Sequence, residues 1–176
     1  MHSAAKSALV SAFCLGLAAC GGAGAGSSRA GMATNFSGID VGNKRFELKT
    51  HLGKDVIYID FWATFCQPCL GAMPHLKALH EKNADRGFTV VAISMDGPES
   101  IGDVRAFVTR NQLPFPVLLD EDSSIAARYN PRKSAPLGLL IDRAGKIVKI
   151  HEGYNQGDER VLEEEVLALL AAPRVP

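Results

Sequence analysis

A run of apolar residues followed directly by two closely spaced cysteines constrains this chain more than any other feature. Residues 56–61 are rich in β-branched and aromatic side chains, the pattern of a strand buried on both faces of a sheet. From residue 67 to about residue 82, apolar residues recur at every third position, which predicts an amphipathic helix (Leu70, Met73, Leu76 and Leu79). Cys66 and Cys69 therefore lie where a buried strand leads into a helix.

The position of Cys66 at the predicted helix start favours redox chemistry. The first turn of a helix has free N–H groups and the positive end of the macrodipole, and both stabilise a thiolate relative to a thiol. Pro68 fits this turn because its missing N–H would have been unpaired anyway. A first cysteine with a lowered pKa and a second one at Cys69 can form and break a disulfide, so we expect the pair to react.

The alternative for a C-x-x-C pair is one half of a zinc site. A structural zinc ion needs four ligands, and the nearest candidates here are His75 and His80. These two lie roughly 140° apart around one helix axis, so they cannot converge on one ion with both thiols. The sequence contains no second C-x-x-C pair, and a strand before the motif with a helix after it favours redox chemistry over metal binding.

The segment Phe-Trp-Ala-Thr-Phe-Cys-Gln-Pro-Cys at residues 61–69 resembles the active site of the thioredoxin superfamily. The resemblance is to its membrane-tethered TlpA/ResA-like branch and extends from about residue 36 to the C-terminus. Asp60 matches the buried acid of thioredoxins. Ala135 and Pro136 fall where the family keeps a cis-proline. The resemblance therefore implies a thioredoxin-like fold and thiol–disulfide exchange.

The resemblance also implies roles for these residues. Cys66 would attack a substrate disulfide, and Cys69 would resolve the mixed disulfide while Asp60 takes or relays its proton. Burial in an apolar strand would raise the pKa of Asp60, although a strand-end carboxylate bonded to neighbouring N–H groups is the alternative. A cis Pro136 would place the backbone of Ala135 beside the disulfide to pair with a substrate strand, whereas a trans proline would open an edge strand.

Other residues near the motif are expected to surround the active site. Trp62 is expected to pack beneath the motif, and Gln67 and Pro68 separate the two cysteines. The chain departs from the family pattern at Phe65, where relatives often have tryptophan, and at Leu137, where they commonly have threonine. These departures concern the choice of substrate more than the chemistry.

Residues 1–19 are predicted to be a lipoprotein signal peptide, outside the folded domain. The start is weakly basic, and residues 8–19 are apolar but too few to span a bilayer permanently. The sequence Leu-Ala-Ala-Cys-Gly at residues 17–21 resembles the lipobox of bacterial lipoproteins, in which the cysteine, here Cys20, is lipidated. An ordinary signal peptide is the alternative. Residues 20–34 are rich in Gly, Ala and Ser and are predicted to be a flexible tether.

Cysteine usage and charge narrow the function further. Of four cysteines, Cys14 lies in the signal segment and Cys20 would carry lipid, which leaves Cys66 and Cys69. Exported proteins meet an oxidising compartment, and this pair is too close in sequence to join distant elements. With 19 Lys and Arg against 19 Asp and Glu, the chain has no basic field that would favour nucleic acid.

Residues 35–176 are predicted to form one domain, because the chain is too short for two. A hairpin is expected at residues 36–48, and strands that alternate with helices predict an α/β sandwich. Further strands are expected at residues 88–95, 116–119, 137–141 and 146–151, and helices at residues 99–111, 123–129 and 158–170. By resemblance, this is a thioredoxin-like three-layer sandwich in which residues 99–129 are a central helix–strand insertion.

The sequence as a whole predicts an exported, lipid-anchored thiol–disulfide oxidoreductase that faces the periplasm or the cell exterior. It would reduce disulfides of other exported proteins, receive electrons from a membrane or exported donor, and need no cofactor besides its Cys66–Cys69 disulfide. A disulfide oxidase or isomerase of the same fold is the alternative. From a different class, a copper-binding chaperone would use both cysteines with a histidine or Met73. A peroxidase is disfavoured because the Pro-x-x-x-Thr-x-x-Cys pattern is absent.

Overall fold

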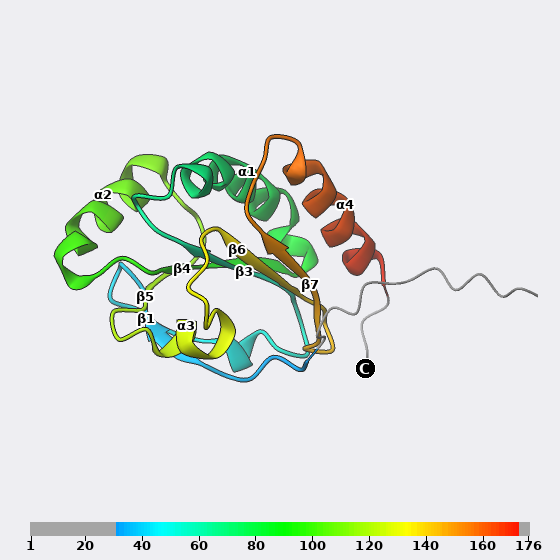
Figure 1. Cartoon of the computed structure of the whole chain (residues 1–176). Coiled ribbons are helices and arrows are strands. Elements are labelled where there is room, and N and C mark those ends of the chain that lie inside the picture. The colour runs from blue at the N-terminus through cyan, green and yellow to red at the C-terminus, as the bar shows by residue number, and fades with distance from the viewer. Residues whose placement is uncertain (1–30, 173–176) are drawn as a thin grey trace, which may run out of the picture.

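A five-stranded mixed sheet forms the centre of the computed structural model, which describes residues 31–172 (Figure 1). The strand order is β5-β4-β3-β6-β7. The strands are β3 (Val56–Trp62), β4 (Phe88–Ser94), β5 (Val117–Leu119), β6 (Leu137–Ile141) and β7 (Ile147–Glu152). The predicted signal segment, Cys20 and most of the predicted tether lie outside the described residues.

Strand β3 is the middle strand and is buried along its whole length, as its sequence predicts. It runs parallel to β4 and antiparallel to β6. Because successive side chains of a strand point to opposite faces, Tyr58 and Trp62 pack in one core cluster and Ile57, Ile59 and Phe61 in a second. Both faces of the sheet are therefore covered.

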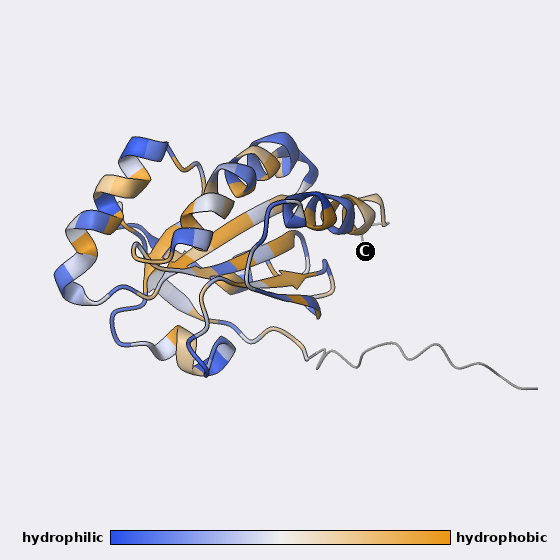
Figure 2. Cartoon of the chain, turned by 45° about the horizontal axis from the view of Figure 1, so that its top comes forward, coloured by the Kyte–Doolittle hydropathy of each residue, from blue (hydrophilic) through white to orange (hydrophobic). Residues whose placement is uncertain are grey.

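One face is covered by three helices and the other by a helix and a hairpin (Figure 1). The first layer contains α1 (Gln67–Asn83), α2 (Ile101–Asn111) and α4 (Asp158–Ala171). The second contains α3 (Ser124–Tyr129) and the antiparallel strands β1 (Ser37–Ile39) and β2 (Arg45–Glu47). Figure 2 shows apolar residues concentrated on the sheet and polar residues on the outer helix faces. The predicted three-layer sandwich, with its N-terminal hairpin and its helix–strand insertion, is confirmed.

Local differences from the expected elements are small. The helix expected from residue 99 begins as a 3-10 turn, Pro98–Ser100, and continues as α2. Within the predicted tether, the carbonyl of Gly31 accepts a hydrogen bond from the N–H of Ile147, so the described chain starts against the β6–β7 hairpin. Among residues 31–172, no helix combines the length and apolar character needed to cross a membrane.

Candidate active site

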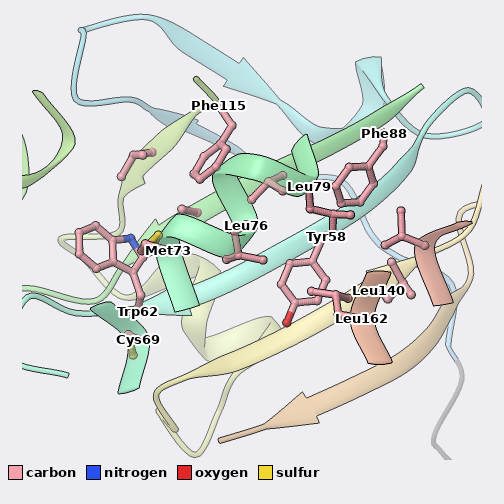
Figure 3. Close-up of a cluster of buried hydrophobic side chains, with 14 of the residues drawn as sticks. Tyr58, Trp62, Cys69, Met73, Leu76, Leu79, Phe88, Phe115, Leu140 and Leu162 are labelled. Atoms are coloured by element: carbon pink, nitrogen blue, oxygen red, sulfur yellow. The ribbon is translucent and has the colours of Figure 1, made fainter. Parts of the chain in front are cut away.

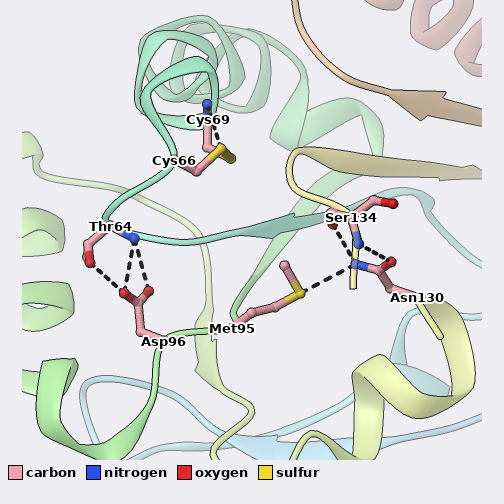
Figure 4. The surroundings of a disulfide bond; sticks show 7 residues. All are labelled: Thr64, Cys66, Cys69, Met95, Asp96, Asn130 and Ser134. Carbon is pink, nitrogen blue, oxygen red and sulfur yellow. Dashed lines mark hydrogen bonds between the residues drawn. A yellow bond between two sulfur atoms is a disulfide. The ribbon is translucent and has the colours of Figure 1, made fainter. Parts of the chain in front are cut away.

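Cys66 and Cys69 form a disulfide at the N-terminal end of α1, where the sequence places them (Figure 4). Their sulfur atoms are 2.01 Å apart. Cys66 is the N-cap residue of α1, and its sulfur accepts a hydrogen bond from the backbone N–H of Cys69 at 3.3 Å. Cys66 is 8% exposed and Cys69 is 0% exposed, so solvent reaches the pair through Cys66.

The loop between β3 and Cys66 is held by Asp96, a residue that the sequence analysis did not single out. Both carboxylate oxygens of Asp96 accept hydrogen bonds from the backbone N–H of Thr64, at 3.1 and 3.0 Å. The hydroxyl group of Thr64 donates to the same carboxylate (Figure 4), and so does the hydroxyl group of Ser94. Asp96 is buried just after β4. Because β3 and β4 are parallel, their carboxyl ends meet at one edge of the sheet. Residues that directly follow two such strands lie near each other, and this rule could have linked Asp96 to Thr64.

A second loop, residues 130–136, is part of the surroundings of the disulfide that Figure 4 draws, and it ends at a cis Ala135–Pro136 peptide bond. Asn130 is buried and holds this loop through two hydrogen bonds to the backbone of Ser134, at 2.7 and 2.9 Å. The Asn130 amide also donates to the sulfur of Met95, which directly precedes Asp96 (Figure 4). Residues at the end of β4 therefore contact both loops.

Asp60 lies on the face of β3 that packs beneath α1, between Tyr58 and Trp62. Its side chain is 3% exposed, and its Oδ2 atom has no hydrogen-bond partner among the described residues. Burial raises the pKa of Asp60 to about 7, the direction that the sequence predicts. The alternative was a carboxylate bonded to neighbouring N–H groups, and among the described residues no such group donates to Oδ2.

Asp60 lines a cavity of about 200 Å³ beneath α1. The cavity is also lined by Tyr58, Pro136 and Gly138. Figure 3 shows the hydroxyl of Tyr58 directed toward β6. Burial, followed by the negative charges of Asp60 and Glu165, raises the pKa of Tyr58 far above its usual value, so this phenol stays protonated.

The remaining predicted site residues are Trp62, Gln67, Pro68, Ala135 and Pro136. Trp62 is fully buried and packs against Phe107, with ring centroids 5.1 Å apart. Gln67 and Pro68 are exposed in the first turn of α1. Ala135 is exposed, whereas Pro136 is buried.

A copper or zinc site at the two cysteines would need further ligands close to them. Met73 is 1% exposed in the core, and His75 is exposed on the surface of α1. Within residues 31–172, no three side chains of His, Cys, Asp or Glu converge to hold a metal ion.

Comparisons with known proteins agree with this fold and this site. The AhpC/TSA family matches residues 30–150. The chain is 34% identical over 144 residues to the thiol-disulfide oxidoreductase ResA of Halalkalibacterium halodurans, a match that covers 81% of this chain and 78% of ResA.

Solved structures are similar over most of the chain. A Chlorobium tepidum protein assigned as the thiol:disulfide interchange protein DsbE is 31% identical, with a TM-score of 0.73 over 81% of this chain and 97% of that one. A secreted Mycobacterium tuberculosis disulfide oxidoreductase, homologous to DsbE of E. coli, is 25% identical, with a TM-score of 0.65 over 76% and 96% of the two chains. The chain therefore belongs to the AhpC/TSA family, within its thioredoxin-like group of thiol-disulfide oxidoreductases.

Proposed function

We propose that the protein reduces disulfides of other exported proteins through its Cys66–Cys69 pair. In the dithiol form, the Cys66 thiolate attacks one sulfur of a substrate disulfide, forms a mixed disulfide and releases the other substrate sulfur as a thiolate. Cys69 then attacks the sulfur of Cys66, closes the internal disulfide and releases the second substrate thiol. An exported or membrane donor returns two electrons to the pair.

The observation that carries this proposal is the buried carboxyl of Asp60, on the strand that leads into the cysteine motif, whose Oδ2 atom has no hydrogen-bond partner within residues 31–172. A pKa of about 7 leaves this carboxyl able both to take and to give up a proton near neutral pH. We assign to Asp60 the proton of Cys69, which must leave before that thiol can attack the mixed disulfide.

The position of Cys66 supports its assignment as the attacking residue. It is the more exposed member of the pair, and it caps a helix of 17 residues whose macrodipole stabilises a thiolate. Cys69 is fully buried one turn further along the helix, which suits a thiol that reacts only inside the mixed disulfide. The exposed Ala135 offers the backbone against which the substrate strand would lie.

Residues outside the described part of the chain carry the proposal of export and anchoring. We assign residues 1–19 to a signal peptide and Cys20 to lipidation, which would hold the domain at a bacterial membrane, facing the periplasm or the cell exterior. The similar Mycobacterium tuberculosis protein is described as secreted, which supports export. A Cys20→Ala variant should move from the membrane fraction to the soluble exported fraction and keep its thiol chemistry. A variant that still pelleted with membranes would show that residues 1–19 provide the anchor.

The role of Asp60 is tested by the rate at which Cys69 resolves a preformed mixed disulfide on Cys66. An Asp60→Asn variant should resolve it more slowly near neutral pH and recover as rising pH ionises Cys69 unaided. An Asp103→Asn variant makes the same chemical change on the exposed surface of α2 and should match the unmodified protein. Equal rates for the Asp60→Asn variant and the unmodified protein across this pH range would remove Asp60 from the mechanism.

The reducing direction is tested by the reduction potential of the pair. A value near that of thioredoxin, about −270 mV, would support a reductase. A value near that of DsbA, about −120 mV, would instead support the oxidase alternative.

A further inference from the structure

The cavity beneath α1 lies close to the reacting sulfurs. Ala72 lines it and is three residues, or about 4.5 Å along the helix axis, beyond Cys69. Pro136, at the end of the loop of residues 130–136, lines the same cavity. A substrate polypeptide whose cysteine reacts with Cys66 therefore has neighbouring side chains within reach of this cavity.

Part of the cavity wall is apolar. It is formed by Ala72 and Leu76 from α1, Pro136 just before β6 and Leu162 from α4. Ala72, Leu76 and Leu162 are each at most 9% exposed, so they form a fixed surface. Such a surface suits the aliphatic stem of a long side chain.

The polar part of the cavity is acidic. Four carboxyl groups line it, and no lysine or arginine does (Asp60, Glu152, Asp158 and Glu159). The other titratable groups that face it are two histidines and two tyrosines (His75, His151, Tyr58 and Tyr154). The wall of the cavity therefore has acidic side chains and no lysine or arginine to neutralise them.

Existing contacts leave much of this charge available. Glu159 accepts hydrogen bonds from the backbone N–H of Gly157 and from the hydroxyl of Tyr154. Hydrogen bonds from its own backbone N–H, and then from that of Gly157, lower the pKa of Glu159 and favour its ionised form. Glu152 pairs with Arg132 at 2.9 Å, but both side chains are at least half exposed, where solvent weakens an ion pair. His151 pairs with Glu165 of α4 at 2.9 Å rather than with a carboxylate of the cavity.

Asp60 supplies an independent observation at the floor of the cavity. Its side chain is more than nine-tenths buried, and its Oδ2 atom has no partner among residues 31–172. Buried polar groups usually have a hydrogen-bond partner, so this oxygen marks a position where a donor is missing from the protein itself.

The size of the cavity indicates the kind of ligand. Pockets for small molecules and cofactors usually have volumes of about 300–1,000 Å³. At about 200 Å³, this cavity is smaller than that range and suits one side chain of a polypeptide. Lysine and arginine combine an aliphatic stem with a cationic head, which matches the apolar wall and the carboxylates respectively.

We propose that this cavity binds a lysine or arginine side chain of the substrate polypeptide, located within three residues of the cysteine that reacts with Cys66. Three residues of extended chain span about 10 Å. The proposal rests on the proposed function, because it assumes a protein disulfide as the substrate. It adds a substrate class: disulfides flanked by a basic residue.

The test uses pairs of disulfide-bonded peptides that differ at one position near the cysteine. One peptide has lysine and the other has norleucine, which keeps the four-carbon stem without the charge. The rate of mixed-disulfide formation with the reduced protein is measured for each peptide at one fixed pH, about 8. The lysine peptide should react about three to ten times faster, and added salt should reduce this ratio.

Two variants assign the preference to the cavity. The double variant Asp158→Asn/Glu159→Gln should bring the ratio of the two rates close to one. A Glu164→Gln variant removes one negative charge from an exposed position of α4 that does not line the cavity, so its ratio should equal that of the unmodified protein. Thermal unfolding of each variant checks that the fold is kept.

The outcomes separate this inference from the proposed function. If both peptides form the mixed disulfide at equal rates, the cation site is wrong while the disulfide chemistry stands. If the lysine preference survives in the double variant, the site is elsewhere and the inference is also wrong. If neither peptide forms a mixed disulfide, the proposed function itself fails.

Discussion

The hydroxyl oxygen of Tyr58 occupies the space that a side chain at Gly138 would need. A Cβ atom at Gly138 would lie 1.8 Å from this oxygen and 2.3 Å from Cζ of the same ring. Gly138 is paired with Asp60 on β3 and with His151 on β7. Glycine at this position therefore lets the Tyr58 ring extend between β3 and β7, along the wall of the cavity that Asp60 also lines.

A Gly138→Ala substitution should destabilise the protein because the new methyl group must displace the Tyr58 ring. We expect the free energy of unfolding, measured with urea, to fall by about 1–3 kcal/mol. Gly102→Ala is the control, because a Cβ there meets nothing within 4 Å on helix α2. That change should raise stability by about 0.5–1 kcal/mol. Equal stability of the Gly138→Ala variant and the unmodified protein would refute the close approach of Tyr58.

Asp60 should make the stability of the protein depend on pH. Its pKa is about 7 in the folded protein, whereas an aspartate in an unfolded chain has a pKa near 4. Between these values the folded state binds more protons than the unfolded state, so the free energy of unfolding falls as pH rises from about 4 to about 7. This loss is complete above the folded pKa.

An Asp60→Asn variant lacks this titration. The difference in free energy of unfolding, variant minus unmodified protein, should therefore grow by roughly 2–4 kcal/mol between about pH 4 and about pH 8. Urea unfolding of both proteins at several pH values measures it. A difference that is independent of pH would contradict the raised pKa of Asp60.

The sequence predicts those parts of the fold that depend on short stretches of chain. The apolar run at residues 56–61 indicates a buried strand, and the structure has β3 there. The three-residue spacing of apolar side chains after Cys66 indicates helix α1 to within one residue at its end. Ala135 and Pro136 were found through the resemblance, because nothing in two adjacent residues specifies a cis bond.

The contacts that position the site join distant segments, and the sequence does not reveal them. Asp96 holds Thr64 across 32 residues of chain, and Asn130 contacts Met95 across 35. The contact of Tyr58 with Gly138 depends on how β3 and β6 pair. The partners of these residues cannot be identified from the sequence alone, because they depend on how the strands of the sheet pair.

Asp96 should be important for stability because three groups donate to its carboxylate: the Thr64 N–H and the hydroxyls of Thr64 and Ser94. An Asp96→Asn variant keeps one acceptor oxygen and loses the other, which leaves a buried donor without a partner. The free energy of unfolding should fall by about 1–3 kcal/mol. The exposed Asp103→Asn change should alter it by no more than about 0.5 kcal/mol. A loss no larger than this control would mean that Asp96 does not hold the loop.

The same substitution should also slow the reaction with substrate, because Thr64 lies two residues before Cys66. We expect the Asp96→Asn variant to form the mixed disulfide more slowly than the unmodified protein, even under conditions where both are folded. Stopped-flow measurement with one disulfide peptide gives both rates. Identical rates would show that the Thr64 contact stabilises the fold without positioning the cysteine.

The most direct test of the account is to trap the mixed disulfide with single cysteine variants. Cys66 is the more exposed residue of the pair and caps α1, whereas Cys69 is fully buried. A Cys69→Ser variant should accumulate protein joined covalently to its substrate, because nothing resolves the intermediate, and a Cys66→Ser variant should not. Non-reducing electrophoresis and mass spectrometry of the adducts measure both. Adducts that form through Cys69 and not through Cys66 would contradict the assignment of the two cysteines.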